Sequence, residues 1–159
     1  MAPPNDLVID TMMESRWTGD LNRDEALHEA IHTTLGLWGF CKVLAHQCST
    51  ETDERMATTT RVVRHCAKVC ETAVVELANW DTVDPGALRA AVESCIGACE
   101  ETYADFQRYH PELYPGPGAH RHELYDTVHR MRKTMSVVLD CIVACEAFLE
   151  VWFGAEVPE

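Results

Sequence analysis

Residues 84–110 read DPGALRAAVESCIGACEETYADFQRYH, and this stretch carries the start and stop signals of one complete α-helix. Asp84 is a good N-cap, Pro85 suits the first helical position, and Pro111 ends the helix after His110. A turn of about 100° per residue brings the apolar residues onto one face. That face holds Leu88, Ala91, Val92, Cys95, Ala98, Cys99 and Phe106. A helix with one apolar face needs partner helices to cover it.

Three more segments show the same periodicity, and no alternating pattern predicts a strand. They span about residues 23–47, 53–80 and 120–153, with turn-forming stretches between them. Long helices joined mostly by short loops predict an all-α fold, an antiparallel up-down-up-down four-helix bundle. We expect an N-terminal extension at 1–20, the bundle at 21–153 and a C-terminal tail at 154–159.

A cysteine motif repeats in three of the predicted helices. It reads Cys66-Ala-Lys-Val-Cys70-Glu71, Cys95-Ile-Gly-Ala-Cys99-Glu100 and Cys141-Ile-Val-Ala-Cys145-Glu146. Cysteines four residues apart share a helix face, with Cβ atoms roughly 5–6 Å apart. This spacing is too wide for an easy disulfide, but it suits one metal ion held between two sulfurs.

All eight cysteines are predicted to point into the bundle, because helical rotation places each one among apolar residues. Cys41 and Cys48 share one seam of the first long helix. If the ends of the four helices are level, the cysteines form a ladder of sulfurs along the bundle axis. The ladder is densest where Cys66, Cys70, Cys95 and Cys99 meet. Buried cysteine can also act as a small apolar residue. Eight inward thiols, six of them in paired spacing, favour a metal site over packing alone.

Composition excludes several classes of partner. The formal net charge is −13, which repels nucleic acid and anionic membrane surfaces. No apolar run is long enough to span a membrane, and the first residues lack the pattern of a signal peptide. We therefore expect a cytoplasmic protein, in which cysteines stay reduced and serve metal or redox chemistry.

Thiolate ligands select Cu(I), Zn(II) or iron–sulfur clusters. Structural zinc and iron–sulfur sites typically use ligand spacings on turns or loops, which are absent from this sequence. Straight helices can hold two- or three-coordinate Cu(I) without losing backbone hydrogen bonds. We therefore expect several Cu(I) ions per chain. Zn(II) accepts the same thiolates and is the less favoured occupant.

The repeated Cys-x-x-x-Cys-Glu units inside long helices resemble the cysteine-rich four-helix-bundle copper storage proteins, in particular their cytosolic branch. The resemblance covers about residues 23–153. It implies many Cu(I) ions bound by inward thiolates, with His or Met ligands near the open end of the bundle. This chain departs from the family in having only eight cysteines, a wider pair at Cys41 and Cys48, and a long N-terminal segment. The departure favours a load of a handful of ions.

Two histidine-containing features lie outside the cysteine repeat. A copper-loading port is predicted near Cys48, at one end of the bundle, from His46, Met56, His110, His120 and His122. The alternative is that these histidines are solvated groups at helix ends. The stretch His28-Glu29-Ala-Ile-His32 matches the H-E-x-x-H pattern of zinc peptidases. Both histidines fall on the outer face, and no third ligand follows at a family spacing, so the match carries little weight.

Three functions remain open from the sequence. The first is Cu(I) storage, buffering or detoxification through Cys41, Cys48, Cys66, Cys70, Cys95, Cys99, Cys141 and Cys145. The second is a copper-dependent oxidoreductase that uses a small thiolate cluster. The third is a partner-binding bundle with incidental cysteines. The predicted partners are copper ions or a copper donor, such as a chaperone or a small thiol, and a homo-oligomer stays open.

Overall fold

The computed structural model describes residues 4–110 and 125–154 and is all-α in these ranges. Its helices are α1 (Pro4–Met12), α2 (Leu21–Ser49), α3 (Glu54–Ala78), α4 (Pro85–Tyr109) and α5 (Tyr125–Phe153). The predicted helical segments are thus present, although the part of the last one before residue 125 lies outside the described residues. No helix in the described ranges is long and apolar enough to cross a membrane.

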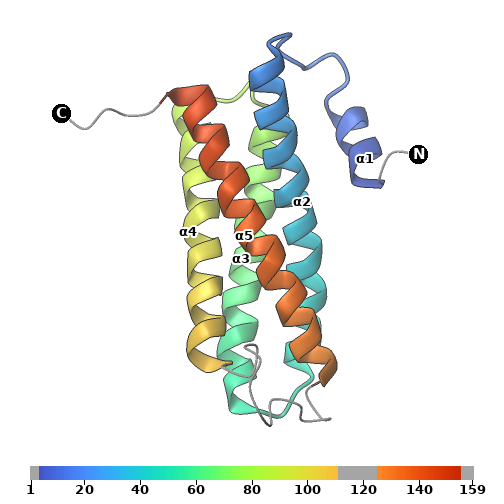
Figure 1. Ribbon diagram of the computed structural model, residues 1–159, viewed down its shortest axis with the longest axis vertical. Coiled ribbons are helices and arrows are strands. Elements are labelled where there is room, and N and C mark those ends of the chain that lie inside the picture. The colour runs from blue at the N-terminus through green and yellow to red at the C-terminus, as the bar shows by residue number, and fades with distance from the viewer. Residues whose placement is uncertain (1–3, 111–124, 155–159) are drawn as a thin grey trace, which may run out of the picture.

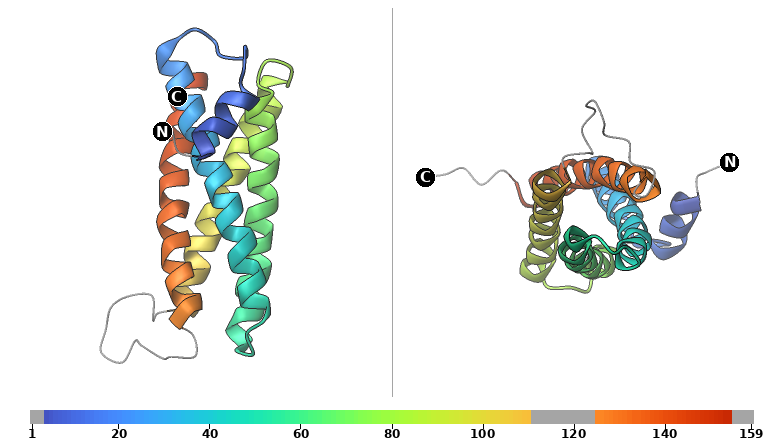
Figure 2. Two further views of the ribbon diagram at one scale, coloured as in Figure 1. Left: turned by 90° about the vertical axis from the view of Figure 1, so that its right-hand side faces the viewer. Right: turned by 90° about the horizontal axis from the view of Figure 1, so that it is seen from below.

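The four long helices lie side by side around a common interior (Figures 1 and 2). Helix α2 contacts α3 and α5, and α4 contacts the same two helices on the other side. The α2–α3 connection lies at the lower end in Figure 1, and the α3–α4 connection lies at the upper end. This arrangement is compatible with the predicted up-down-up-down bundle.

Aspartates cap three of the long helices, and Asp84 is the cap that the sequence predicts. Asp20, Asp53 and Asp84 accept hydrogen bonds from the backbone N–H groups of Arg23, Arg55 and Ala87. Each cap satisfies a donor that the first helical turn leaves without a partner. The caps therefore fix where α2, α3 and α4 begin.

Aromatic side chains pack together at the upper end of the molecule. The rings of Trp80 and Trp152 meet edge to face, with centroids 5.1 Å apart, and Trp152 stacks on Phe148. The Arg23 guanidinium lies 4.1 Å from the Trp152 ring centroid. Arg16 donates to the carbonyl of Ala78 at 3.0 Å, so the segment before α2 also covers this end.

Helix α1 lies inside residues 1–20, which the sequence predicts to be an N-terminal extension. It packs on the outside of α2, and Ile9 is fully buried there (Figure 1). Met13, directly after α1, is also fully buried. The structure therefore adds to the bundle a short helix that the sequence does not predict.

Candidate metal centre

All eight cysteines lie in the interior, and each is at most 1% exposed. Each long helix contributes two of them, and all are free thiols. The glutamates that follow each pair, Glu71, Glu100 and Glu146, are exposed on the outer surface. The thiols therefore face the interior, as helical rotation predicts from the sequence, and the carboxylates lie on the outer surface.

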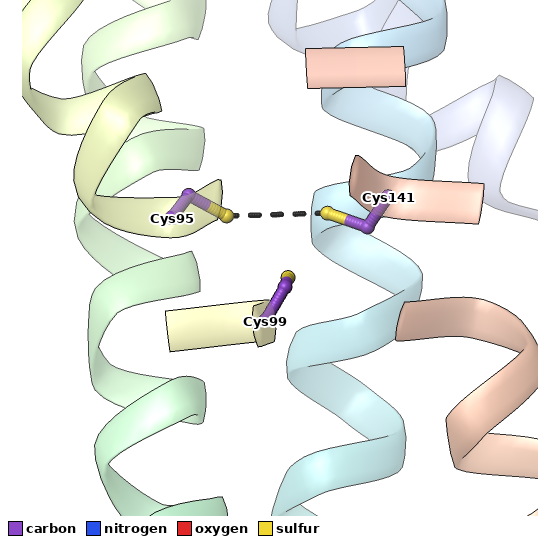
Figure 3. A group of neighbouring side chains, drawn as sticks. All are labelled: Cys95, Cys99 and Cys141. Atoms are coloured by element: carbon purple, nitrogen blue, oxygen red, sulfur yellow. Dashed lines mark hydrogen bonds between the residues drawn. The ribbon is translucent and has the colours of Figure 1, made fainter. Parts of the chain in front are cut away.

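Three thiols from two helices form the tightest group. The Sγ atoms of Cys95, Cys99 and Cys141 all lie within 4.8 Å of one another. Cys95 and Cys141 face each other from α4 and α5 at 3.9 Å, and Cys99 lies next to both (Figure 3). The group therefore joins two helices through sulfur.

Further thiols extend this group in both directions. Cys70 Sγ of α3 lies 3.9 Å from Cys95 Sγ, and Cys145 Sγ lies 3.9 Å from Cys141 Sγ. Cys66 interacts with Cys41 of α2, Cys70 and Cys99. Seven cysteines thus form one connected sulfur cluster, which we define as Cys41, Cys66, Cys70, Cys95, Cys99, Cys141 and Cys145.

These separations fit a soft metal ion. With metal–sulfur bonds of about 2.3 Å, three sulfurs around a trigonal ion lie about 4.0 Å apart, and two sulfurs across a linear ion lie about 4.6 Å apart. The observed 3.9 Å contacts and the 4.8 Å limit of the tight group fall close to these values. The cluster is therefore compatible with copper–thiolate binding without a large movement of the helices.

Hydrogen bonds within the cluster shift the pKa values of its thiols in opposite directions. Hydrogen bonds from neighbouring thiols, Cys41 foremost, lower the pKa of Cys66. Those from Cys141 and other thiols likewise lower the pKa of Cys95. The pKa values of Cys70 and Cys99 are raised. Each thiol would lose the hydrogen bonds that it donates to neighbouring sulfurs if it ionised, and burial also disfavours the charged form. The sulfurs of Cys66 and Cys95 therefore favour negative charge, because neighbouring S–H groups donate hydrogen bonds to them. A bound cation can take the place of those S–H protons.

Two threonine hydroxyls contact the cluster, and neither is among the residues that the sequence predicts as ligands. Thr34 Oγ1 of α2 lies 3.6 Å from Cys141 Sγ and 3.8 Å from Cys145 Sγ. Thr102 of α4 interacts with Cys66. Thr34 lies seven residues before Cys41, and this spacing was the only sequence signal that it shares the cysteine seam.

Cys48 lies at the lower end of α2, about 10 Å of helical rise beyond Cys41. Burial raises its pKa to about 12, and the carboxylates of Glu51 and Asp105 act in the same direction. Met56 and His110 are both fully buried in this part of the fold. His110 Nε2 lies 2.6 Å from Thr59 Oγ1, which donates a hydrogen bond to Asp105 Oδ2 at 2.8 Å.

The structure therefore brings together only some of the residues predicted for the loading port. Met56 and His110 lie inside the fold, whereas His46 is exposed on the outer side of α2. His120 and His122 lie outside the described residues. Asp105 was not predicted at this end. Burial raises its pKa, against the opposing effects of the Thr59 hydrogen bond and the His110 charge.

The fold and the thiol cluster define a class, that of helical proteins whose cysteine-lined interior is compatible with metal–thiolate binding. The family model described as Csp, copper storage protein, matches residues 23–114, which is more than half of the chain. The chain belongs to the copper storage protein family. The match spans α2, α3 and α4 and includes six of the eight cysteines, all but Cys141 and Cys145. No curated protein and no solved structure matches the chain.

Proposed function

We propose that this protein binds several Cu(I) ions through its eight cysteine thiolates and so stores or buffers copper in the cytoplasm. The ligands lie inside an antiparallel up-down-up-down bundle formed by α2 to α5. The observation that carries the proposal is the group of Cys95, Cys99 and Cys141, whose sulfur separations suit two- or three-coordinate Cu(I). Membership of the copper storage family supports copper as the cargo. Zn(II) is the alternative ion.

Storage accounts for the site better than catalysis does. The thiols are at most 1% exposed, so a bound ion would be surrounded by protein and not open to a substrate. A catalytic metal site keeps an open coordination position, whereas a closed site holds its ion. No observation on the described residues favours the copper-dependent oxidoreductase.

An anaerobic titration of the reduced protein with Cu(I), against a competing chelator, tests the proposal. We expect several tightly bound ions per chain, with all eight thiols protected from alkylation at the endpoint. Zn(II) titrated under the same conditions should bind fewer ions and should be displaced by Cu(I). Failure to bind more than one weak Cu(I) ion would refute copper storage. A sharp endpoint at a few ions with an oxygen-reactive product would instead favour the enzyme.

We further propose that copper enters at the lower end, past Met56, His110 and Cys48. At the opposite end Trp80 and Trp152 pack edge to face and the Arg23 guanidinium lies over the Trp152 ring, so we expect these side chains to hinder entry there. Thioether, imidazole and thiolate groups all suit copper. These ligands would pass the ion inward from Cys48 to Cys41 and the cluster.

Met56→Leu should slow Cu(I) loading and leave the final number of ions unchanged. Leucine replaces methionine with little change in volume, typically at a cost below about 1.5 kcal/mol, so the fold should persist. Stopped-flow loading from a Cu(I) complex measures the rate. Met13→Leu is the matched control, because Met13 is equally buried beside α1 and away from Cys48. Equal loading rates in the two variants would contradict the proposed port.

A further inference from the structure

A surface groove lies among α1, α2 and α5, on the outside of the bundle. Helices α1 and α5 both pack against α2 (Figure 1). The groove has a volume of about 770 Å³, which falls within the range of about 300–1,000 Å³ that is usual for small-molecule sites. Its lining on α2 runs from Leu35 to Leu44, a rise of about 13 Å along the helix axis. No cysteine is among the described residues that line it, so the groove is separate from the sulfur cluster.

The inner surface of the groove is mostly apolar. Val8, Phe40 and Val43 line it, and these residues are 46%, 40% and 52% exposed. Trp38 also lines it and is half-buried. Single exposed apolar residues are common on protein surfaces, but several of them in one groove indicate an interaction site. A ligand with an apolar body would remove this surface from water, and that transfer favours binding.

Two glycines of α2 keep the groove open. Gly36 and Gly39 both line it. A glycine inside a helix destabilises the helix relative to alanine. Close packing does not require the glycine at position 39, because a Cβ added there would meet no neighbouring atom within 4 Å. The space next to Gly39 belongs to the groove, so a larger side chain at this position would fill it.

The wall that α5 forms carries unpaired positive charge. Arg130 and Lys133 line the groove, are exposed, and lie three residues apart on one side of the helix. Neither side chain forms an ion pair or a hydrogen bond with another described residue. Asp126 is the one carboxylate among the described residues of the lining, whereas the whole chain has 26 acidic residues against 13 basic ones. The groove therefore reverses the acidic balance of the protein and favours an anion.

We propose that the groove binds a small amphipathic anion, a carboxylate with an apolar chain such as a medium-chain fatty acid. The apolar chain lies against Phe40 and Val43, and the carboxylate faces Arg130 and Lys133. Charge-assisted hydrogen bonds from these two cationic side chains hold the carboxylate. A second copy of this chain is a less suitable occupant, because two copies that each carry a net charge of −13 repel each other. The proposal does not depend on copper storage.

Calorimetric titration of the full chain with decanoate tests the charged part of the site. We expect one decanoate ion per chain, with binding weaker by about 10-fold or more in the double variant Arg130→Gln, Lys133→Gln, because both charge-assisted hydrogen bonds are lost. The double variant Arg64→Gln, Lys68→Gln is the matched control, because both residues are exposed on α3, none of whose described residues lines the groove. Decanol has the same chain without the charge and should bind the wild type and the first double variant equally.

A variant that fills the groove tests its apolar part. Gly39→Leu places an apolar side chain in the open space, so it should abolish decanoate binding. Gly97→Leu is the matched control, because a Cβ at this position of α4 also meets nothing within 4 Å and Gly97 does not line the groove. Leucine favours a helix more than glycine does, so both variants should stay folded, which thermal unfolding followed by circular dichroism checks.

The outcomes that contradict this site are distinct from those that contradict copper storage. Absence of saturable decanoate binding to the wild type would overturn the proposal, and so would equal affinity in Gly39→Leu and the wild type. A wild-type dimer that Gly39→Leu converts to monomers, measured by analytical ultracentrifugation, would assign the groove to a second copy instead. None of these measurements involves copper, so their result is independent of the Cu(I) titration.

Discussion

Replacement of Cys95 by serine should weaken Cu(I) binding more than replacement of a cysteine at the edge of the cluster. Cys95 Sγ lies 3.9 Å from the sulfurs of Cys70 and Cys141 and belongs to the tight group with Cys99. Its loss removes a ligand shared by three helices, and a hydroxyl is a poor ligand for a soft ion. We expect binding about 10- to 100-fold weaker for the ions of this layer, with fewer ions at saturation.

Cys48→Ser is the matched control for this experiment. Cys48 is as buried as Cys95 but lies about 10 Å beyond Cys41, at the end of the bundle. Its loss should remove at most one ion and leave the central layer intact. The hydroxyl of a serine in a helix can donate a hydrogen bond to the carbonyl four residues earlier. Both variants should therefore keep their helical content, which circular dichroism measures. Equal copper loss in the two variants would refute a central cluster around Cys95.

Copper loading should strongly stabilise the fold, because the sulfur cluster connects all four long helices. An ion at 1,000 times its Kd adds about 4 kcal/mol to the free energy of unfolding, if the unfolded chain does not bind it. For a chain of this size each kcal/mol raises Tm by roughly 2–4 °C, so one such ion should add on the order of 10 °C. Thermal unfolding with and without Cu(I), followed by circular dichroism, measures the difference.

The stabilisation should shrink as the pH falls. Burial raises the pKa of Cys48 to about 12, and the pKa values of Cys41, Cys70, Cys99 and Cys145 are also raised, so these thiols hold protons at neutral pH. Thiolate ligands must lose those protons when copper binds, and a lower pH opposes their release. We expect a smaller copper-induced rise in Tm at pH 6 than at pH 8. A rise that does not change with pH would argue against binding through these thiols.

Local signals predicted most of the fold. Asp84 caps α4, as its place before Pro85 and the periodic segment indicated, and Asp20 and Asp53 cap α2 and α3. The predicted second long helix ran to Trp80, whereas α3 ends at Ala78. There the Asn79 side chain accepts a hydrogen bond from Arg16, and the Trp80 indole donates one to the Arg16 carbonyl. Such contacts, between residues more than 60 positions apart, have no local signature.

For the candidate copper site too, part of the arrangement could be predicted from local sequence and part depends on tertiary packing. The four-residue spacing determines that each cysteine pair shares a face, and the apolar residues on that face determine that it is buried. Which thiols meet depends on how far each helix is shifted along its neighbours. The structure pairs Cys95 with Cys141 and Cys70, which spacing within one helix cannot predict. It also brings the Thr34 hydroxyl to Cys141, a contact that depends on the packing of α2 against α5.

The sequence by itself determined that this chain is helical, that eight thiols face its interior and that they suit a soft metal ion. The reason is that helix periodicity and thiolate chemistry are local properties of the residues. Only the tertiary structure decided that Cys95, Cys99 and Cys141 form the tightest group and that a groove bordered by Arg130 and Lys133 lies among α1, α2 and α5. These features form through the packing of separate helices, whose relative shift and rotation are set by the whole core.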